Sequence, residues 1–243
     1  SYAAEGHYGV TVQVRDLSGI QTVATSAVTV LDSPPSGPTP PRSTPITGGD
    51  ANHVWVVNPD NNTVTLIDTD TLTNEFEVPV GADPRSIARA GTGEIWVTCH
   101  DADRLDVLSA ADGSLLTSLS LAYGAEPYGI AFSPDGSVGY VSLQGSGQLL
   151  RIDPVSRVVT GTLALGFEPR AIAVSSSGDR VLVTRFTSPE SHGEIYDVDA
   201  AIFTLTRIIT LAKDASPDTS NGGRGVPNYL GGIAITPNGA GAW

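Results

Sequence analysis

The sequence predicts an all-β fold made of repeated four-stranded sheets, and an internal repeat is the main evidence. Residues 84–88 (Pro-Arg-Ser-Ile-Ala) recur as residues 127–131 and 169–173, and a displaced fourth copy stands at residues 232–235. The first three copies follow one another at about 42 residues, the length of one four-stranded β-propeller blade. Each of these copies precedes a glycine-containing turn and a run of aliphatic or aromatic residues. Because one such unit cannot bury its own apolar faces, we predict a partial β-propeller of about three and a half blades.

Composition narrows the classes of partner. The formal net charge is −13, which disfavours nucleic acids and anionic membrane surfaces, since both are bound through clustered Lys and Arg. Cys99 is the single cysteine, so neither an intrachain disulfide nor a thiolate metal cluster is available. No apolar run reaches the roughly 18 residues of a membrane span. The chain opens within a strand pattern and stops inside the fourth repeat copy, so we expect a piece of a longer protein.

The first expected element is a β-hairpin within residues 1–32. Residues 8–14 alternate Tyr or Val with Gly, Thr and Gln, residues 16–19 favour a turn, and residues 23–30 form a second β-rich run. Two strands are not stable alone, so we expect the rest of their sandwich upstream. The order Gly-His-Tyr-Gly-Val-Thr-Val at residues 6–12, followed by Val-Arg-Asp-Leu-Ser-Gly, resembles the closing strands of a PKD-type immunoglobulin-like domain. We therefore interpret residues 1–32 as the C-terminal strands of such a domain.

Residues 33–51 are interpreted as a linker because prolines cluster in them. Proline at this density favours extended polyproline geometry and is excluded from sheet interiors, which predicts a semi-rigid spacer. The propeller is expected to occupy residues 52–243 and to be truncated at its C-terminal end.

The first blade is expected to contain strands at residues 54–57, 63–68 and 76–81, with a polar turn at residues 58–62. No innermost strand is evident before them. Closed propellers have about four to eight blades, and we expect a strand from the far end of the chain to complete the first one.

Several short sequence motifs recur from blade to blade. A valine-rich strand, a strand ending in Ile-Asp and a strand ending in Val-Gly open the series, and later blades carry residues 133–136 (Ser-Pro-Asp-Gly), 152–154 (Ile-Asp-Pro) and 165–169 (Leu-Gly-Phe-Glu-Pro). This pattern resembles the YVTN-repeat β-propeller family, although residues 90–93 and 175–178 depart from the Ser-Pro-Asp-Gly turn. The resemblance implies a WD40-like propeller and defines no activity, because propellers host unrelated functions.

One face of the predicted propeller gathers the irregular sequence, and we call it the looped face. It carries the links between blades, the loops between second and third strands, and an insertion at residues 212–231. Long loops inside a compact repeat are usually functional or disordered. The residues that we expect to form a binding face here are Arg85, His100, Asp101, Tyr128, Arg170, Arg185, His192, Arg224, Asn228 and Tyr229.

An acidic residue stands before the proline of each inter-blade link, at Asp83, Glu126 and Glu168. A repeat places equivalent residues in a ring, so these carboxylates are candidates for a hard-cation site, with calcium as the ion that oxygen ligands suit. The alternative is that each carboxylate accepts backbone hydrogen bonds or pairs with Arg85 or Arg170.

A second candidate is the loop that contains Cys99, His100, Asp101 and Asp103. These residue types suit a metal ion or a nucleophile, whereas a structural loop is the alternative. Of the other histidines, only His192 is expected on the same face, so His100 and His192 are the pair to test. The segment contains no Cys-x-x-Cys-His motif for haem attachment.

The insertion ends in residues 223–230 (Gly-Arg-Gly-Val-Pro-Asn-Tyr-Leu). Arg224, Asn228 and Tyr229 supply donors and a ring of the kind found at protein interfaces. The stretch is similar to propellers of large bacterial surface proteins that continue into di-haem cytochrome peroxidase-like domains. An ordinary surface loop is the alternative.

The leading functional expectation is a non-catalytic binding scaffold within a secreted or cell-surface multi-module repeat protein. Its location would be extracellular, cell-surface or periplasmic, and its partners would be a protein, glycan or ion on the looped face and the remaining blades of the same chain. No cofactor is expected in this segment apart from calcium.

The alternative expectation is the propeller module of a redox or lactonase-like enzyme. In the redox form, the propeller docks a c-type di-haem cytochrome peroxidase-like domain, and haem is carried only by that missing domain. A third option is a structural surface spacer. No nucleophile elbow, histidine pair at ligand spacing or cofactor fingerprint is present in the sequence, so we expect a non-catalytic role.

Overall fold

The computed structural model describes residues 6–15, 21–30, 40–215 and 225–242, and it contains two compact units, residues 1–37 and 38–243. In the first unit, β1 (Gly6–Arg15) and β2 (Gln21–Val30) pair antiparallel, from Gly6 opposite Val30 to Arg15 opposite Gln21. The predicted hairpin is therefore present, while its assignment to a PKD-type domain stays a prediction. Among the described residues there is no helix with the length and apolar character needed to cross a membrane.

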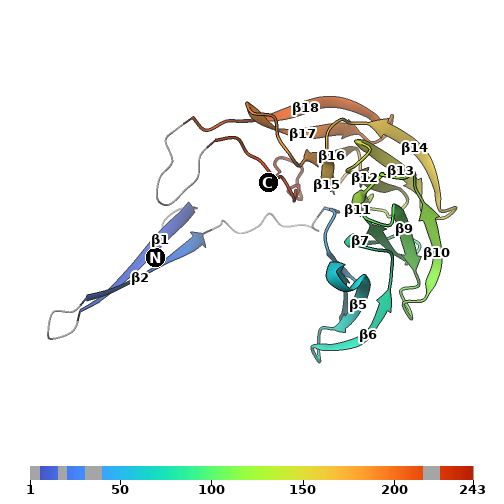
Figure 1. Cartoon of the computed structure of the whole chain (residues 1–243), viewed down its shortest axis with the longest axis horizontal. Helices are drawn as coiled ribbons and strands as arrows, with labels where there is room; N and C mark the ends of the chain where they lie inside the picture. The colour runs from blue at the N-terminus through green and yellow to red at the C-terminus, as the bar shows by residue number, and fades with distance from the viewer. Residues whose placement is uncertain (1–5, 16–20, 31–39, 216–224, 243) are drawn as a thin grey trace. The chain divides into compact units, whose positions relative to one another are not determined.

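In its described residues the second unit contains four antiparallel sheets of four strands, each a meander in chain order, and Figure 1 shows them following one another around an arc. We number these sheets as blades 1 to 4. Their strands are β3 (Ile46–Gly48), β4 (His53–Asn58), β5 (Thr63–Asp68) and β6 (Thr73–Pro79) in blade 1; β7 (Pro84–Arg89), β8 (Ile95–Cys99), β9 (Arg104–Leu108) and β10 (Leu115–Ser120) in blade 2; β11 (Pro127–Phe132), β12 (Gly139–Leu143), β13 (Gln148–Asp153) and β14 (Val158–Ala164) in blade 3; and β15 (Pro169–Val174), β16 (Arg180–Arg185), β17 (His192–Asp199) and β18 (Thr204–Ala212) in blade 4. One 3-10 turn, η1 (Pro59–Asn61), lies between β4 and β5. The all-β propeller prediction is confirmed.

The repeated sequence forms the innermost strand of blades 2, 3 and 4, where β7, β11 and β15 each begin at the repeated proline. Neighbouring blades are joined by apolar clusters of buried side chains. Trp55 lies in the cluster between blades 1 and 2, Trp96 in the cluster between blades 2 and 3, and Tyr140 in the cluster between blades 3 and 4. The copies stack because each buries one apolar face against the next.

The displaced fourth copy continues this packing. Ile233 and Ile235 lie in one buried cluster with Leu182 of blade 4, and Ile235 forms an isolated antiparallel bridge with Ala242. The described residues therefore contain four complete sheets and the start of a further unit, rather than about three and a half blades.

The expectation that a distant strand completes blade 1 is wrong. Strand β3 lies within the segment that the sequence presents as a linker, and it pairs with β4 through Ile46 opposite Val56, Thr47 opposite Trp55 and Gly48 opposite Val54. Three residues are too few to show a period-2 pattern, so the sequence carries no strand signal at this place.

The residues just before β3 also belong to the propeller. Residues 40–45 run along the innermost strands, where the Ser43 N–H donates to the Ile172 carbonyl at 2.7 Å and the Ile87 N–H donates to the Thr44 carbonyl at 2.9 Å. The carbonyls of Pro41 and Pro45 accept from the N–H groups of Val174 and Val57. This segment therefore contacts blades 1, 2 and 4 along the axis, and the spacer prediction now concerns only residues 33–39, which lie outside the described residues.

A buried carboxylate fixes the link between blades 1 and 2. Asp106 on β9 is fully buried, and its oxygens accept from the Gly81 N–H at 2.8 Å and from the Ser118 hydroxyl at 2.6 Å. Arg104 donates to the same carboxylate through Nη2 at 3.0 Å. Through these contacts, Asp106 of blade 2 fixes the inter-blade link at Gly81, where the chain passes from blade 1 to blade 2 on the looped face.

Candidate functional site

The looped face is built by two sets of loops, and the repeat gives them matched residues. Arg85, Tyr128 and Arg170 each occupy the second position of an innermost strand, β7, β11 and β15. Each of the three is half-buried at the start of its strand. Neighbouring blades therefore present Arg, Tyr and Arg in turn at the end of the axis.

These side chains form one stacked series, which we call the arginine–aromatic ladder: Arg85, Tyr128, Arg170, Phe186 and Tyr229. The Arg170 guanidinium carbon lies 4.2 Å from the Tyr128 ring centroid and 3.4 Å from the Phe186 ring centroid, and that of Arg85 lies 5.9 Å from the Tyr128 centroid. The Phe186 and Tyr229 ring centroids are 5.3 Å apart. Each cation–π contact stabilises the array by about 0.5–2 kcal/mol.

In the described part of the chain, the Arg170 guanidinium is fixed by a neutral side chain and not by a carboxylate. Its Nε donates to the Gln144 side-chain oxygen at 2.9 Å, yet within the described residues no carboxylate lies at ion-pair distance from it. Burial lowers the pKa of Arg170 below its usual value; the nearby Arg85 charge acts in the same direction, whereas Tyr128 and the Glu168 charge oppose the shift. By contrast, Arg85 pairs with Asp83, with Nη2 at 2.6 Å from Oδ2.

The repeated acidic residues share a backbone conformation. Asp83, Glu126 and Glu168 have φ of 54°, 50° and 44°, in the left-handed region. Side chains of the preceding loop support this turn, since Asn62 accepts from the Asp83 N–H and Asp103 accepts from the Glu126 N–H, each at 2.8 Å. The repeat at this position therefore has a structural reason of its own.

Their carboxylates have different partners. Asp83 pairs with Arg85, Glu126 lies 3.8 Å from His100 Nε2, and Glu168 Oε2 is buried without a hydrogen-bond partner among the described residues. In that part of the chain, the side-chain groups with metal-compatible spacing are instead Asp83–His100–Asp101 and His53–Asp68–Glu75. The calcium ring of Asp83, Glu126 and Glu168 stays a prediction.

His100 lies beside the ladder. Its Nδ1 is 2.7 Å from Asp101 Oδ1 and 3.4 Å from Asp83 Oδ2, and its ring meets the Tyr128 ring edge-on at a centroid distance of 6.2 Å. The imidazole is 16% exposed, so it supports Tyr128 more than it faces solvent.

Cys99 does not join His100 in a reactive pair. Burial raises the pKa of the Cys99 thiol to about 12, and the Asp106 carboxylate, with Oδ2 3.6 Å from Sγ, adds to the shift. The thiol is therefore protonated at neutral pH, and a thiolate nucleophile or metal ligand is not available there. The structural-loop alternative explains Cys99.

Arg185 and His192 meet at another carboxylate. Arg185 Nη1 lies 2.8 Å from Glu194 Oε2, and His192 Nε2 lies 2.9 Å from Glu194 Oε1. Burial alone would raise the pKa of Glu194, but the hydrogen bonds from Arg185 and His192 outweigh it and lower that pKa. Within the described residues no interaction joins His192 to His100, so the suggested histidine pair is not assembled.

The insertion returns to the looped face at its C-terminal end. The Asn228 side-chain oxygen accepts from the Ser188 N–H at 2.8 Å, and the Tyr229 ring, 68% exposed, packs on Phe186. Arg224, which the sequence analysis also placed here, lies outside the described residues.

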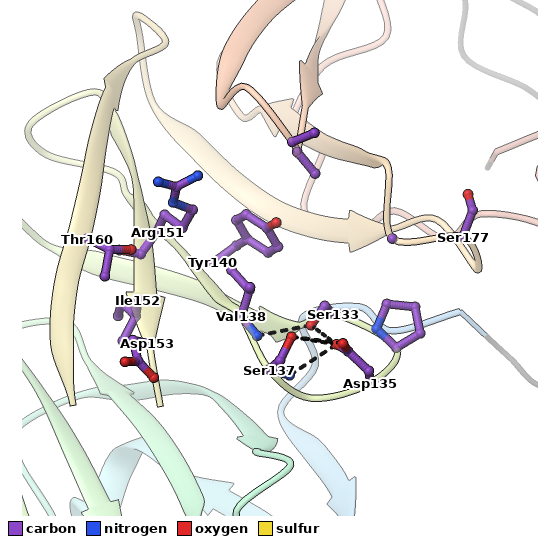
Figure 2. A pocket seen from close by; sticks show the side chains of 14 residues that line it. Ser133, Asp135, Ser137, Val138, Tyr140, Arg151, Ile152, Asp153, Thr160 and Ser177 are labelled. Carbon is purple, nitrogen blue, oxygen red and sulfur yellow. Dashed lines mark hydrogen bonds between the residues drawn. The ribbon is translucent and has the colours of Figure 1, made fainter. Parts of the chain in front are cut away.

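Hollows lie at both faces of the propeller. One of about 320 Å³ lies at the looped end of the axis and is lined by Ser43, Thr44, Pro45, Val57, Pro59, Arg85, Ser86, Tyr128 and Gly231. Another of about 680 Å³ lies between blades 3 and 4 at the opposite face, where the Ser133 and Ser137 hydroxyls both donate to the Asp135 carboxylate near Tyr140 and Arg151 (Figure 2). Hydrogen bonds from Ser133 and Ser137 lower the pKa of Asp135 to about 2, so this polar group is satisfied within its own turn.

Sequence reasoning missed three of these features. Phe186, Gln144 and the hollow at the opposite face were not proposed. Phe186 directly follows Arg185, a residue already proposed for the binding face, and an aromatic residue in a loop that faces solvent is the signal that could have found it.

Comparison with known proteins shows the fold. No protein-family model matches the sequence. A 59-residue stretch is 41% identical to the PE-PGRS family protein PE_PGRS18 of Mycobacterium tuberculosis (strain ATCC 25618 / H37Rv), which covers 24% of this chain and 13% of that protein.

Two solved structures have a similar shape. Hydrazine synthase of Kuenenia stuttgartiensis aligns with a TM-score of 0.66 and 19% identity, over 79% of this chain and 51% of that chain. Virginiamycin B lyase of Staphylococcus aureus aligns with a TM-score of 0.57 and 16% identity, over 89% and 69%. This chain thus spans about half the length of the hydrazine synthase chain and a small part of the mycobacterial protein. These similarities establish a β-propeller fold, while the YVTN family remains a prediction.

Proposed function

We propose that residues 38–243 are a non-catalytic binding module of an exported, multi-module protein, with its ligand on the looped face. The observation that carries the proposal is the arginine–aromatic ladder, in which side chains from three blades and the insertion converge at one place. Tyr and Arg are the residue types that dominate binding energy at protein interfaces. The exposed rings of Tyr229 (68%) and Phe167 (57%) give this face apolar area around the charged groups.

The experiment is a binding screen with the full chain against an array of bacterial and host glycans and a panel of secreted proteins. We expect saturable binding that Tyr229→Ala and His100→Ala weaken at least tenfold. The matched control is Val155→Ala, because Val155 is 78% exposed on the turn between β13 and β14 at the opposite face. Binding that survives a variant carrying both Tyr229→Ala and His100→Ala, or that Val155→Ala reduces as strongly, would contradict the proposal. Absence of any saturable ligand would favour a structural spacer.

A second candidate function, ester or lactone hydrolysis, rests on one observation. The Ser191 hydroxyl lies 2.7 Å from His192 Nδ1, and His192 Nε2 lies 2.9 Å from Glu194 Oε1, which is the order of a nucleophile, a base and an orienting acid. Both structural neighbours are named as enzymes, a synthase and a lyase. Hydrolysis of p-nitrophenyl acetate and of a γ-lactone, compared between the natural chain and Ser191→Ala, tests this candidate. Equal rates for the two proteins would remove it.

The redox form of the alternative, a propeller docked to a di-haem cytochrome domain, is tested on the protein purified from its natural source. A reducible haem absorbance spectrum would support it, and a purified protein without haem would remove it.

A further inference from the structure

Arg170 carries a positive charge that has no ion-pair partner among the described residues. Within the described residues its one polar side-chain partner is the neutral Gln144 oxygen, and no carboxylate lies within ion-pair distance of it. Asp83 pairs with the neighbouring Arg85, whereas Glu168, two residues before Arg170, acts on Arg170 only through its charge and forms no hydrogen bond or ion pair with it. A half-buried guanidinium without a carboxylate in direct contact is costly, so this arrangement suits an anion that arrives from outside.

The guanidinium is also held in place before any ligand arrives. Arg170 is packed between the Tyr128 and Phe186 rings, and Gln144 fixes its Nε. The remaining donors of the fork are its two Nη groups, for which the described residues provide no acceptor. A fixed guanidinium loses little conformational entropy on binding, and its planar fork matches the two oxygens of a carboxylate or phosphate.

The Tyr128 ring contacts the guanidinium groups of both Arg170 and Arg85, and Tyr128 also lines a cavity. Arg85 approaches the same ring at 5.9 Å, and its positive charge opposes that of Arg170. The Tyr128 hydroxyl has no hydrogen-bond partner among the described residues. The hollow of about 320 Å³ at the end of the axis is bordered by Arg85, Tyr128 and Ser86 on the blades and by Ser43 and Thr44 of the axial segment.

We propose that this end of the propeller axis binds the oxyanion of a small ligand, a carboxylate or phosphate group, held by Arg170 and Arg85 with the Tyr128 hydroxyl. The inference rests on the proposed function and deepens it, since it names the chemistry recognised at the looped face. The net charge of −13 repels anions at long range, so saturable oxyanion binding would report this local site and not a diffuse positive surface.

The experiment is isothermal titration of the full chain with two probes, inorganic phosphate and malonate, at constant ionic strength set with chloride. We expect saturable binding of at least one probe, and the probe that binds identifies the oxyanion as a phosphate or a carboxylate. Arg170→Gln should weaken binding at least tenfold, and Arg170→Lys should weaken it less because it keeps the charge without the fork. Tyr128→Phe keeps the ring under both guanidinium groups and should weaken binding a few-fold.

The matched control is Arg89→Gln, because Arg89 lies at the other end of β7 from Arg85 and is exposed. Its affinity should equal that of the natural chain, and the melting temperature of every variant is measured to exclude misfolding. No saturable binding of either probe up to about 10 mM, beyond the usual micromolar to millimolar range of small-ligand sites, would overturn the inference. Equal affinities for folded Arg170→Gln and the natural chain would also overturn it. If a macromolecular partner still binds in a Tyr229-dependent way, the proposed function survives that result.

Discussion

Asp106 should be a main determinant of propeller stability, and Asp106→Ala tests this prediction. The side chain is fully buried and accepts hydrogen bonds from the Gly81 N–H, the Ser118 hydroxyl and the Arg104 guanidinium. The alanine variant leaves the Gly81 N–H without this acceptor at the blade 1–blade 2 link, and it removes the counter-ion of Arg104, whose side chain is 36% exposed.

The structure sets the size of the effect. A buried donor left unpaired costs about 1–3 kcal/mol, and breaking a buried ion pair by removing one partner costs about 3–5 kcal/mol. Because water reaches Arg104 in part, we expect a total loss of about 3–4 kcal/mol in the free energy of unfolding. Asp106→Asn keeps the shape and one acceptor oxygen, so it should lose less.

The assay is urea unfolding followed by tryptophan fluorescence, which is sensitive here because Trp55 and Trp96 are fully buried at the two interfaces of blade 2. Glu190→Gln, a change at an exposed carboxylate, is the control and should leave the midpoint unchanged. A loss below about 1 kcal/mol for Asp106→Ala, the range of an ordinary surface substitution, would refute the reasoning.

Three further predictions follow from other parts of the propeller. Burial alone would raise the pKa of Asp197, but hydrogen bonds from two arginines lower it below its usual value of 3.8. The stability that Asp197 provides is therefore present above pH 3.8 and is lost as the pH falls through the lower folded-state pKa. The unfolding midpoint of Asp197→Asn should depend less steeply on pH in this acid range than that of the natural chain, and equal slopes would contradict this. Cys99, with its pKa raised to about 12, should resist iodoacetamide at pH 8 in the folded chain and react in urea, and rapid native labelling would count against its burial. Gly129→Ala should lower the free energy of unfolding by about 1–3 kcal/mol, because the new Cβ would lie 2.4 Å from the Arg170 carbonyl oxygen. Gly48→Ala has open space around its Cβ and should leave the stability unchanged. Equal thermal stabilities for the two variants would contradict the packing around Arg170.

The sequence predicted the inner strands of blades 2 to 4 because every copy must bury the same apolar positions. Ile87, Ile130 and Ile172 occupy matching places in three copies, and all are almost fully buried between blades. A repeated need to bury the same face leaves a repeated pattern, and that pattern is visible without a structure.

The axial segment and β3 could not be predicted in the same way. Prolines at positions 40, 41 and 45 argue against a sheet interior, since proline lacks an N–H donor. However, proline keeps its carbonyl, and Pro41 and Pro45 use it to accept backbone hydrogen bonds from Val174 and Val57. A proline in the sequence shows that a backbone N–H donor is missing, but it does not show whether the proline carbonyl accepts a hydrogen bond in the fold.

The candidate site was predicted in part. Arg85, Tyr128, Arg170 and Tyr229 were proposed from their repeat position and loop context, and the structure places them in one stacked series. The position of Phe186 between Arg170 and Tyr229 depends on the conformation of the loop after β16. Contacts of that kind are set by tertiary packing and leave no spacing signal in the chain.

The most direct test of the looped-face account is hydrogen–deuterium exchange of the full chain with and without the ligand found in the binding screen. We predict that protection on binding is confined to peptides of the inter-blade links at residues 81–85, 124–128 and 166–170 and of residues 185–193. Peptides of the opposite-face turns, at residues 133–137 and 175–179, should exchange at unchanged rates. Protection confined to those opposite turns would contradict the account, because it would place the ligand at the other end of the propeller.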